Sequence, residues 1–134
     1  PITSFFAELD AFVEEGGNET TQPYVDAVAA THAQLKQGTD WLMNNALENF
    51  DHAGAGSHDY LNLFGLTCMT YMWAMMAKAS AEALANGTAD ATFHETKLAT
   101  GRYYMARHLP ATGMHLARIM SGAEPVMALA EDQF

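Results

Sequence analysis

The chain has 134 residues, of which 49% are hydrophobic and only 16% are charged. This length and composition predict one packed globular domain rather than a disordered segment. The formal net charge of -10 argues against binding to nucleic acid or to anionic membranes, because both need basic patches on the protein.

Apolar residues recur at helical spacing almost throughout, and no alternating strand pattern is present, so we predict an all-α domain. The first helix is predicted over residues 4–15, with glycines 16 and 17 as its stop. The second is predicted over residues 22–50, with Pro23 in the first turn, where its missing N–H costs nothing. Its apolar row has the three-four spacing of a bundle seam: Val25, Val28, His32, Leu35, Thr39, Leu42, Ala46 and Phe50.

The glycine-rich segment AGAGS at residues 53–57 is predicted to be the turn that follows. A third helix is then predicted over residues 58–86, with Ser57 as its N-cap and Gly87 as its stop.

The fourth helix is predicted over residues 91–121, followed by an apolar tail over residues 123–134. Pro110 should bend this helix, because an interior proline removes a backbone hydrogen bond. The expected fold is therefore a four-helix bundle-like domain with a kinked last helix and an apolar C-terminal tail.

The third predicted helix is unusual because no Asp, Glu, Lys or Arg occurs from Tyr60 to Ala77. Its large apolar groups form two faces about 140° apart, and smaller groups form a third sector. Three alternatives follow: a membrane span, a helix enclosed by its own chain, or a helix that shares one face with a partner. The acidic flank and the lack of basic anchors argue against a membrane span.

We favour the partner alternative, because large exposed apolar patches on soluble domains usually mark contacts and methionine adapts its shape to them. The contact is predicted on one of two faces, represented by Tyr71 or by Trp73. The full set of interface candidates is Phe64, Leu66, Met69, Tyr71, Trp73, Met75 and Met76.

No catalytic, cofactor-binding or metal-binding residue is predicted in this chain. No Glu-x-x-His motif for a di-iron bundle is present, and His32 on the apolar seam fits a hydrogen-bonded core histidine better than a metal ligand. Cys68, the single cysteine, excludes an internal disulfide, is consistent with a reducing cytoplasm, and should be inert in an apolar helix. Four basic residues could bind an anionic ligand: Lys97, Arg102, Arg107 and Arg118. Ion pairs with the many acidic residues of the chain are the simpler alternative.

Three segments resemble the extra C-terminal domain of long acyl-CoA dehydrogenases, the acetyl-CoA dehydrogenase-like C-terminal domain. They are HDYLNLFGLTCMTYMWAMMAKA (58–79), FHETKLATGRYYMARHLP (93–110) and RIMSGAEPVMALAEDQF (118–134). Within that family the chain is most similar to the 3-methylmercaptopropionyl-CoA dehydrogenase subgroup. The resemblance implies a bacterial FAD-dependent enzyme that oxidises an acyl-CoA to its 2,3-enoyl form.

In that family the flavin, the acyl-CoA and the catalytic glutamate are held by preceding domains, so the resemblance assigns no such residue here. It implies instead a C-terminal fragment of a larger enzyme, which would explain why the chain starts with Pro1. We therefore expect an accessory domain that packs against the dehydrogenase body or a second subunit of a cytoplasmic homo-oligomer. The rival prediction is a self-contained bundle that binds a small ligand or a metal between its helices.

Overall fold

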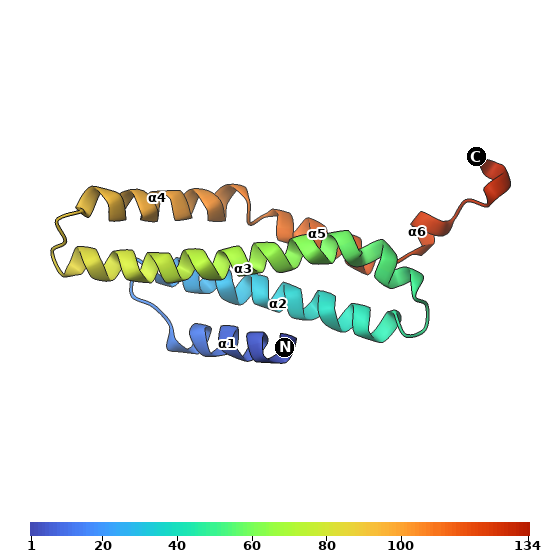
Figure 1. The fold of residues 1–134 in the computed structure, drawn as a ribbon, viewed down its shortest axis with the longest axis horizontal. Helices are drawn as coiled ribbons and strands as arrows, with labels where there is room; N and C mark the ends of the chain where they lie inside the picture. Colours follow the sequence, from blue (N-terminus) through green and yellow to red (C-terminus); the bar gives the residue numbers. More distant parts are fainter.

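A computed structural model describes residues 1–134, and they form an all-α structure without strands. Four main elements make up the bundle, the last of them a bent helix in two parts (Figure 1). The helices are α1 (Ile2–Glu15), α2 (Gln22–Asn45), α3 (Asp51–Ala85), α4 (Ala91–Arg107), α5 (Ala111–Met120), α6 (Glu124–Met127) and the 3-10 turn η1 (Glu131–Gln133). The predicted fold class is thereby confirmed.

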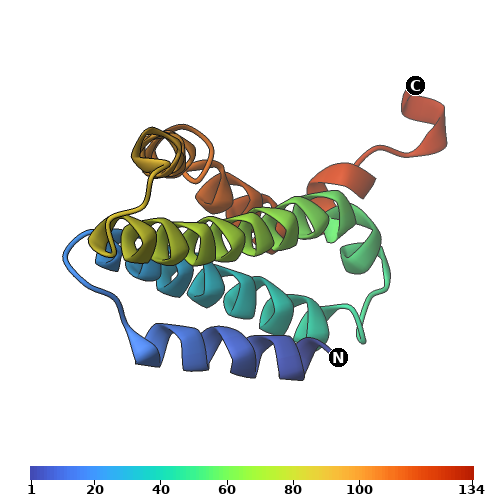
Figure 2. The ribbon, with the colours of Figure 1, turned by 60° about the vertical axis from the view of Figure 1, so that its left-hand side comes forward.

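The long helix α3 lies at the centre of the bundle and packs against α2, α4 and α5. Helix α2 also packs against α1 and α5. Figure 2 shows α3 in front, with α1 on one side of it and α4 on the other, while α6 and the C-terminus project away from the bundle. One long side of α3 therefore has no helix of this chain in front of it.

The predicted bend in the last helix is confirmed and lies at Pro110. Helix α4 ends at Arg107 and α5 begins at Ala111, because the proline has no N–H to continue the helical ladder. The last turn widens before the break: the His108 N–H bonds to the Tyr104 carbonyl at 2.9 Å as in an α-helix, and the Leu109 N–H bonds to the same carbonyl, five residues back, at 3.2 Å.

The predicted turn at residues 53–57 is wrong, and so are the adjoining boundaries at residues 50 and 58. The turn lies at residues 46–50, and α3 begins at Asp51, seven residues earlier than predicted. Ser57 is therefore no N-cap, since its hydroxyl donates to the Gly54 carbonyl within the helix at 2.9 Å. The Asn49 side chain serves the start of α3 instead, where its oxygen accepts the Asp51 N–H at 3.0 Å.

Tertiary packing explains why the glycines of residues 53–57 lie in a helix. Glycine costs a helix interior about 1 kcal/mol relative to alanine, but Gly56 is buried where α2 and α5 both approach α3. A Cβ at this position would lie 3.3 Å from Leu42 Cδ2 and 3.8 Å from Ile119 Cγ2. The missing side chain thus permits a close approach of three helices.

The predicted seam of α2 forms much of the core. Val25, Val28, His32 and Leu35 are buried, whereas Phe50 lies in the turn beyond the helix and is 82% exposed. The larger core cluster comprises Leu9, Tyr24, Val28, Tyr71, Ala74, Ala77 and Leu98, and the smaller comprises Leu35, Leu63 and Ile119. The glycine stops are confirmed by positive φ angles of 72° at Gly16 and 74° at Gly87.

Candidate interface on helix α3

The inner side of α3 carries the small side chains rather than either of the bulky faces. Thr67, Thr70, Ala74 and Ala77 are buried there together with Leu63. The two threonine hydroxyls donate to the Leu63 and Leu66 carbonyls at 2.9 and 2.7 Å, so neither is left without a partner. Small groups at three-four spacing allow neighbouring helices to approach closely.

The bulky face represented by Tyr71 lies against α1. Phe64 stacks on Phe5 with ring centroids 5.5 Å apart, and Tyr71 meets Phe12 edge-on at 5.0 Å. The Tyr71 hydroxyl donates to Glu8 Oε1 at 2.8 Å. Burial, followed by this hydrogen bond, raises the pKa of Tyr71 above its usual value of 10.0.

The opposite bulky face, represented by Trp73, lies against α4. Trp73 stacks on Tyr104 at 6.1 Å between centroids, and Lys97 Nζ lies 5.7 Å from the indole ring. The Tyr104 hydroxyl donates to the Leu66 carbonyl at 2.8 Å. Burial is the main reason why the pKa of Tyr104 is raised.

Both bulky faces therefore have cover from this chain, and the uncovered surface lies between them. We call it the methionine face and define it as the outward residues of α3: Leu61, Gly65, Met69, Met72, Met75 and Ala79. Leu61 is 72% exposed, and the three methionines are 43–48% exposed. No exposed residue of α3 between Gly54 and Ala79 is Asp, Glu, Lys or Arg.

The seven sequence-predicted interface residues fall into three groups. Met69 and Met75 lie on the methionine face, Phe64, Leu66, Trp73 and Met76 are half-buried at its flanks, and Tyr71 is buried beneath α1. Sequence reasoning missed Met72 and Leu61 as contact candidates. Their position in the helix could have identified them. Residues 65, 72 and 79 repeat every seven residues on the side of α3 opposite the small buried side chains, so the residues of this side are expected to face outward.

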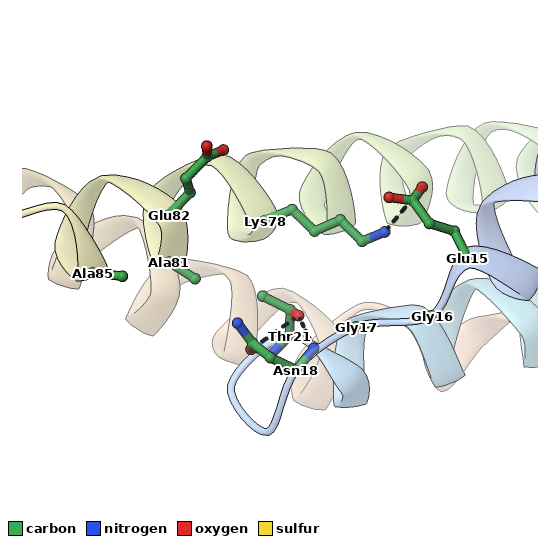
Figure 3. Close-up of a pocket in the computed structure, with 9 residues that line it drawn as sticks. All are labelled: Glu15, Gly16, Gly17, Asn18, Thr21, Lys78, Ala81, Glu82 and Ala85. Atoms are coloured by element: carbon green, nitrogen blue, oxygen red, sulfur yellow. Dashed lines mark hydrogen bonds and ion pairs between the residues drawn. The ribbon is translucent and has the colours of Figure 1, made fainter.

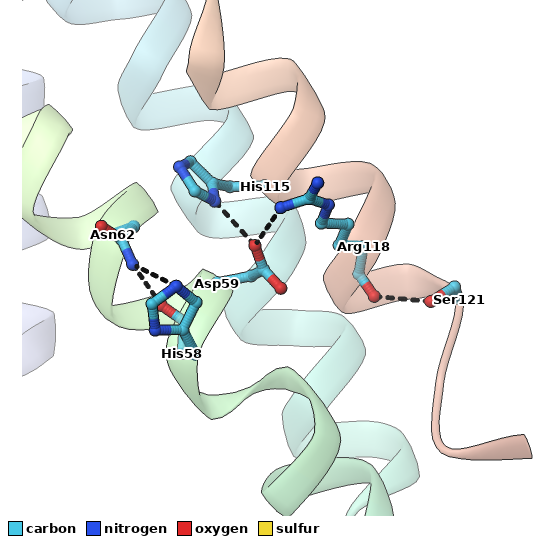
Figure 4. A network of polar contacts seen from close by, with 6 residues as sticks. All are labelled: His58, Asp59, Asn62, His115, Arg118 and Ser121. Carbon is cyan, nitrogen blue, oxygen red and sulfur yellow. Dashed lines mark hydrogen bonds and ion pairs between the residues drawn. The ribbon is translucent and has the colours of Figure 1, made fainter. Parts of the chain in front are cut away.

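The chain also buries an acid–base network that joins α3 to α5 (Figure 4). The His115 imidazole Nδ1 lies 2.7 Å from Asp59 Oδ1, and Arg118 Nη1 lies 3.7 Å from the same oxygen. Asp59 is 9% exposed and His115 8%. A carboxylate bonded to one imidazole nitrogen can orient a histidine for acid–base chemistry. None of the hollows in the structure is lined by this pair, however, so we interpret it as a structural contact that holds α3 against α5.

Two further histidines, His32 and His52, also have partners within the chain. His32 is buried with Nδ1 3.3 Å from Asp10 Oδ1, in agreement with its interpretation as a core histidine. Burial, and secondly Lys36, lowers its pKa below 6.5 despite the opposing attraction of Asp10. His52 Nδ1 accepts the Ala123 N–H at 3.0 Å at the start of the tail. No group of three His, Cys, Asp or Glu side chains is placed to hold a metal ion.

The largest hollow has a volume of about 500 Å³ and lies between the α1–α2 loop and the end of α3 (Figure 3). Lys78 reaches across it to Glu15 at 3.4 Å, and the Asn18 N–H is already bonded to the Thr21 hydroxyl at 2.9 Å. Alanines 81 and 85 are its only apolar lining. A flavin ring needs a largely apolar slot with a few free polar groups, so these residues do not fit FAD and we assign none to a cofactor.

Residues 5–130 match the family model described as Acetyl-CoA dehydrogenase C-terminal like. The chain belongs to this family. The match extends the resemblance found in the sequence, which rested on α3 and the segments after it, to α1 and α2. No curated protein matches the chain. None of the helices combines the length and hydropathy that a membrane span requires.

Proposed function

We propose that this domain is an accessory packing module of an acyl-CoA dehydrogenase-like flavoenzyme, and that its methionine face is the contact. The parent enzyme would oxidise an acyl-CoA to the 2,3-enoyl-CoA in the bacterial cytoplasm, with FAD and the catalytic base held by preceding domains. Membership of the Acetyl-CoA dehydrogenase C-terminal like family over residues 5–130 supports this parent, and we propose the 3-methylmercaptopropionyl-CoA dehydrogenase subgroup for it. The 134 residues by themselves would contribute contact surface and no chemistry.

The uncharged methionine face carries this proposal. A helix at the surface of a globular protein normally turns charged residues outward, whereas the outward side of α3 bears none over 26 residues, Gly54 to Ala79. Large apolar patches of this kind are typical of surfaces that are covered by a partner. Met69 and Met75 would contribute directly, while Trp73 and Phe64 would form the flanks of the contact. Tyr71 would act only through its hold on α1.

The test places a charge on the methionine face of the complete enzyme that carries this domain. Met72→Glu is compared with Met114→Glu on α5, because the two methionines are nearly equally exposed, at 43% and 44%. We expect Met72→Glu to lower the mass of the assembled enzyme measured by light scattering, and Met114→Glu to leave it unchanged. Circular dichroism of each variant verifies that the helices remain intact. Equal assembly of the two variants would show that the face is not a contact.

A further inference from the structure

We propose that the methionine face packs on the methionine face of a second copy of this chain, with the two α3 helices parallel about a two-fold axis that runs along them. This inference rests on the proposed function. It names a second copy of the chain as the partner because the charges at the two edges of the face favour that pairing.

The dimensions of the face suit such a pairing. The face runs from Leu61 to Ala79, and these 19 residues extend for about 27 Å at 1.5 Å per residue. Helices α1 and α4 flank α3 on opposite sides (Figure 2), so the face is bordered by one helix of this chain on each side. A face of this length, about five helical turns, can pack along its whole extent on the same face of a second copy.

The two edges of this face carry opposite charges. On the α1 side, the exposed carboxylate of Glu8 accepts a hydrogen bond from Tyr71, and the exposed carboxylate of Glu15 pairs with Lys78 of α3 at 3.4 Å. Glu8 is therefore the carboxylate of this edge that has no base beside it. On the α4 side, Lys97 lies beside Trp73, and Trp73 lies between Tyr71 and Lys78 along α3. Lys97 makes no ion pair within its own chain.

Symmetry then decides how two copies can meet. A two-fold axis parallel to α3 leaves each residue of the second copy at the same height along the axis, and it places the α1 edge of one copy against the α4 edge of the other. Lys97 of each copy then faces Glu8 and Glu15 of the other. An axis across α3 would make the helices antiparallel and would place the acidic α1 edges against each other. Opposite charges favour the parallel arrangement, and like charges oppose the antiparallel one. The net charge of -10 on each copy adds a long-range repulsion, which physiological salt screens beyond about 8 Å.

Cysteine cross-linking tests the arrangement directly. In a Cys68→Ala background, Gly65→Cys, Met72→Cys and Ala79→Cys are prepared one at a time and treated with a short bifunctional thiol reagent. In the parallel dimer every position faces its own counterpart, so all three variants should cross-link to dimers. In an antiparallel pair at most the position nearest the crossing would do so. Met114→Cys is the control and should remain monomeric.

Charge reversal tests the choice of partner. We expect Lys97→Glu, or Glu8→Lys with Glu15→Lys, to weaken dimerisation in analytical ultracentrifugation by about five- to tenfold, as expected for rim charges. Combining all three reversals should restore the dissociation constant to within about twofold, which a merely structural role of these side chains would not do.

Cross-linking at fewer than all three positions, or a failure of the combined reversals to restore affinity, would overturn the parallel dimer. If this occurs while Met72→Glu still disrupts the complete enzyme, the packing function stands and another part of the enzyme covers the face. If Met72→Glu also leaves the enzyme intact, the packing function itself fails.

Discussion

The contact between Gly101 and Tyr24 offers a sharp test of the packing described above. Gly101 is buried in α4 at the point where the Tyr24 ring of α2 crosses the helix. A Cβ at this position would lie 2.7 Å from Tyr24 Cε1 and 3.0 Å from its hydroxyl. Tyr24 is only 3% exposed, and its hydroxyl donates to the Leu98 carbonyl at 2.6 Å. The ring therefore has no free space into which it could move.

For Gly101→Ala we expect net destabilisation, although alanine is the better helix former. To reach an ordinary contact of 3.4 Å, the ring must move by about 0.7 Å. Overpacking of this kind costs about 1–3 kcal/mol, and realigning the buried hydrogen bond adds about 1 kcal/mol. The gain in helix propensity returns about 1 kcal/mol. The free energy of unfolding should thus fall by about 1–3 kcal/mol, and the melting temperature by roughly 4–10 °C.

Urea unfolding followed by circular dichroism measures this effect, with Gly54→Ala as the matched control. Gly54 is also in a helix, but a Cβ there would meet nothing within 4 Å. The control should therefore be unchanged or gain up to about 1 kcal/mol. A Gly101→Ala variant that is as stable as Gly54→Ala would refute the close approach of Tyr24 and with it this junction of α2 and α4.

Three further predictions follow from buried polar groups. The pKa of His32 is lowered, so the folded chain binds a proton at this group less readily than the unfolded chain does. The stability that the neutral imidazole contributes is therefore complete above pH 6.5 and is lost as the pH falls below this value. His32→Gln should flatten the decline in unfolding free energy between about pH 7 and 5, and an unchanged decline would contradict the assignment. Asp59→Ala leaves His115 without its partner and should cost about 2–3 kcal/mol in urea unfolding, whereas removing the exposed carboxylate of Asp40 should cost under about 0.5 kcal/mol. Burial raises the pKa of the Cys68 thiol, so a thiol reagent at pH 8 should react at least about tenfold faster in denaturing urea than with the folded chain; equal rates would place Cys68 in open solvent.

Much of the fold could be predicted because its causes are local. The three-four row of α2 buries Val25, Val28 and Leu35 wherever the helix packs. Pro110 bends the last helix because it has no N–H to donate, and Gly87 ends α3 because it adopts a positive φ at little cost. Each of these features depends on one residue type or one periodicity, so neighbouring elements are not needed to predict it.

The tertiary structure alone decided the start of α3 and the face that α3 leaves open. By local propensity Gly56 marks a turn, but it lies inside α3, where a Cβ would be only 3.3 Å from Leu42 and 3.8 Å from Ile119 of the neighbouring helices. The sequence showed two bulky faces on α3 and could not show that α1 would cover Tyr71 while α4 covered Trp73. Whether a side chain of α3 is buried depends on where the other helices pack. Met72 lies between the two bulky faces and stays exposed because α1 and α4 cover those faces and no helix covers the surface between them.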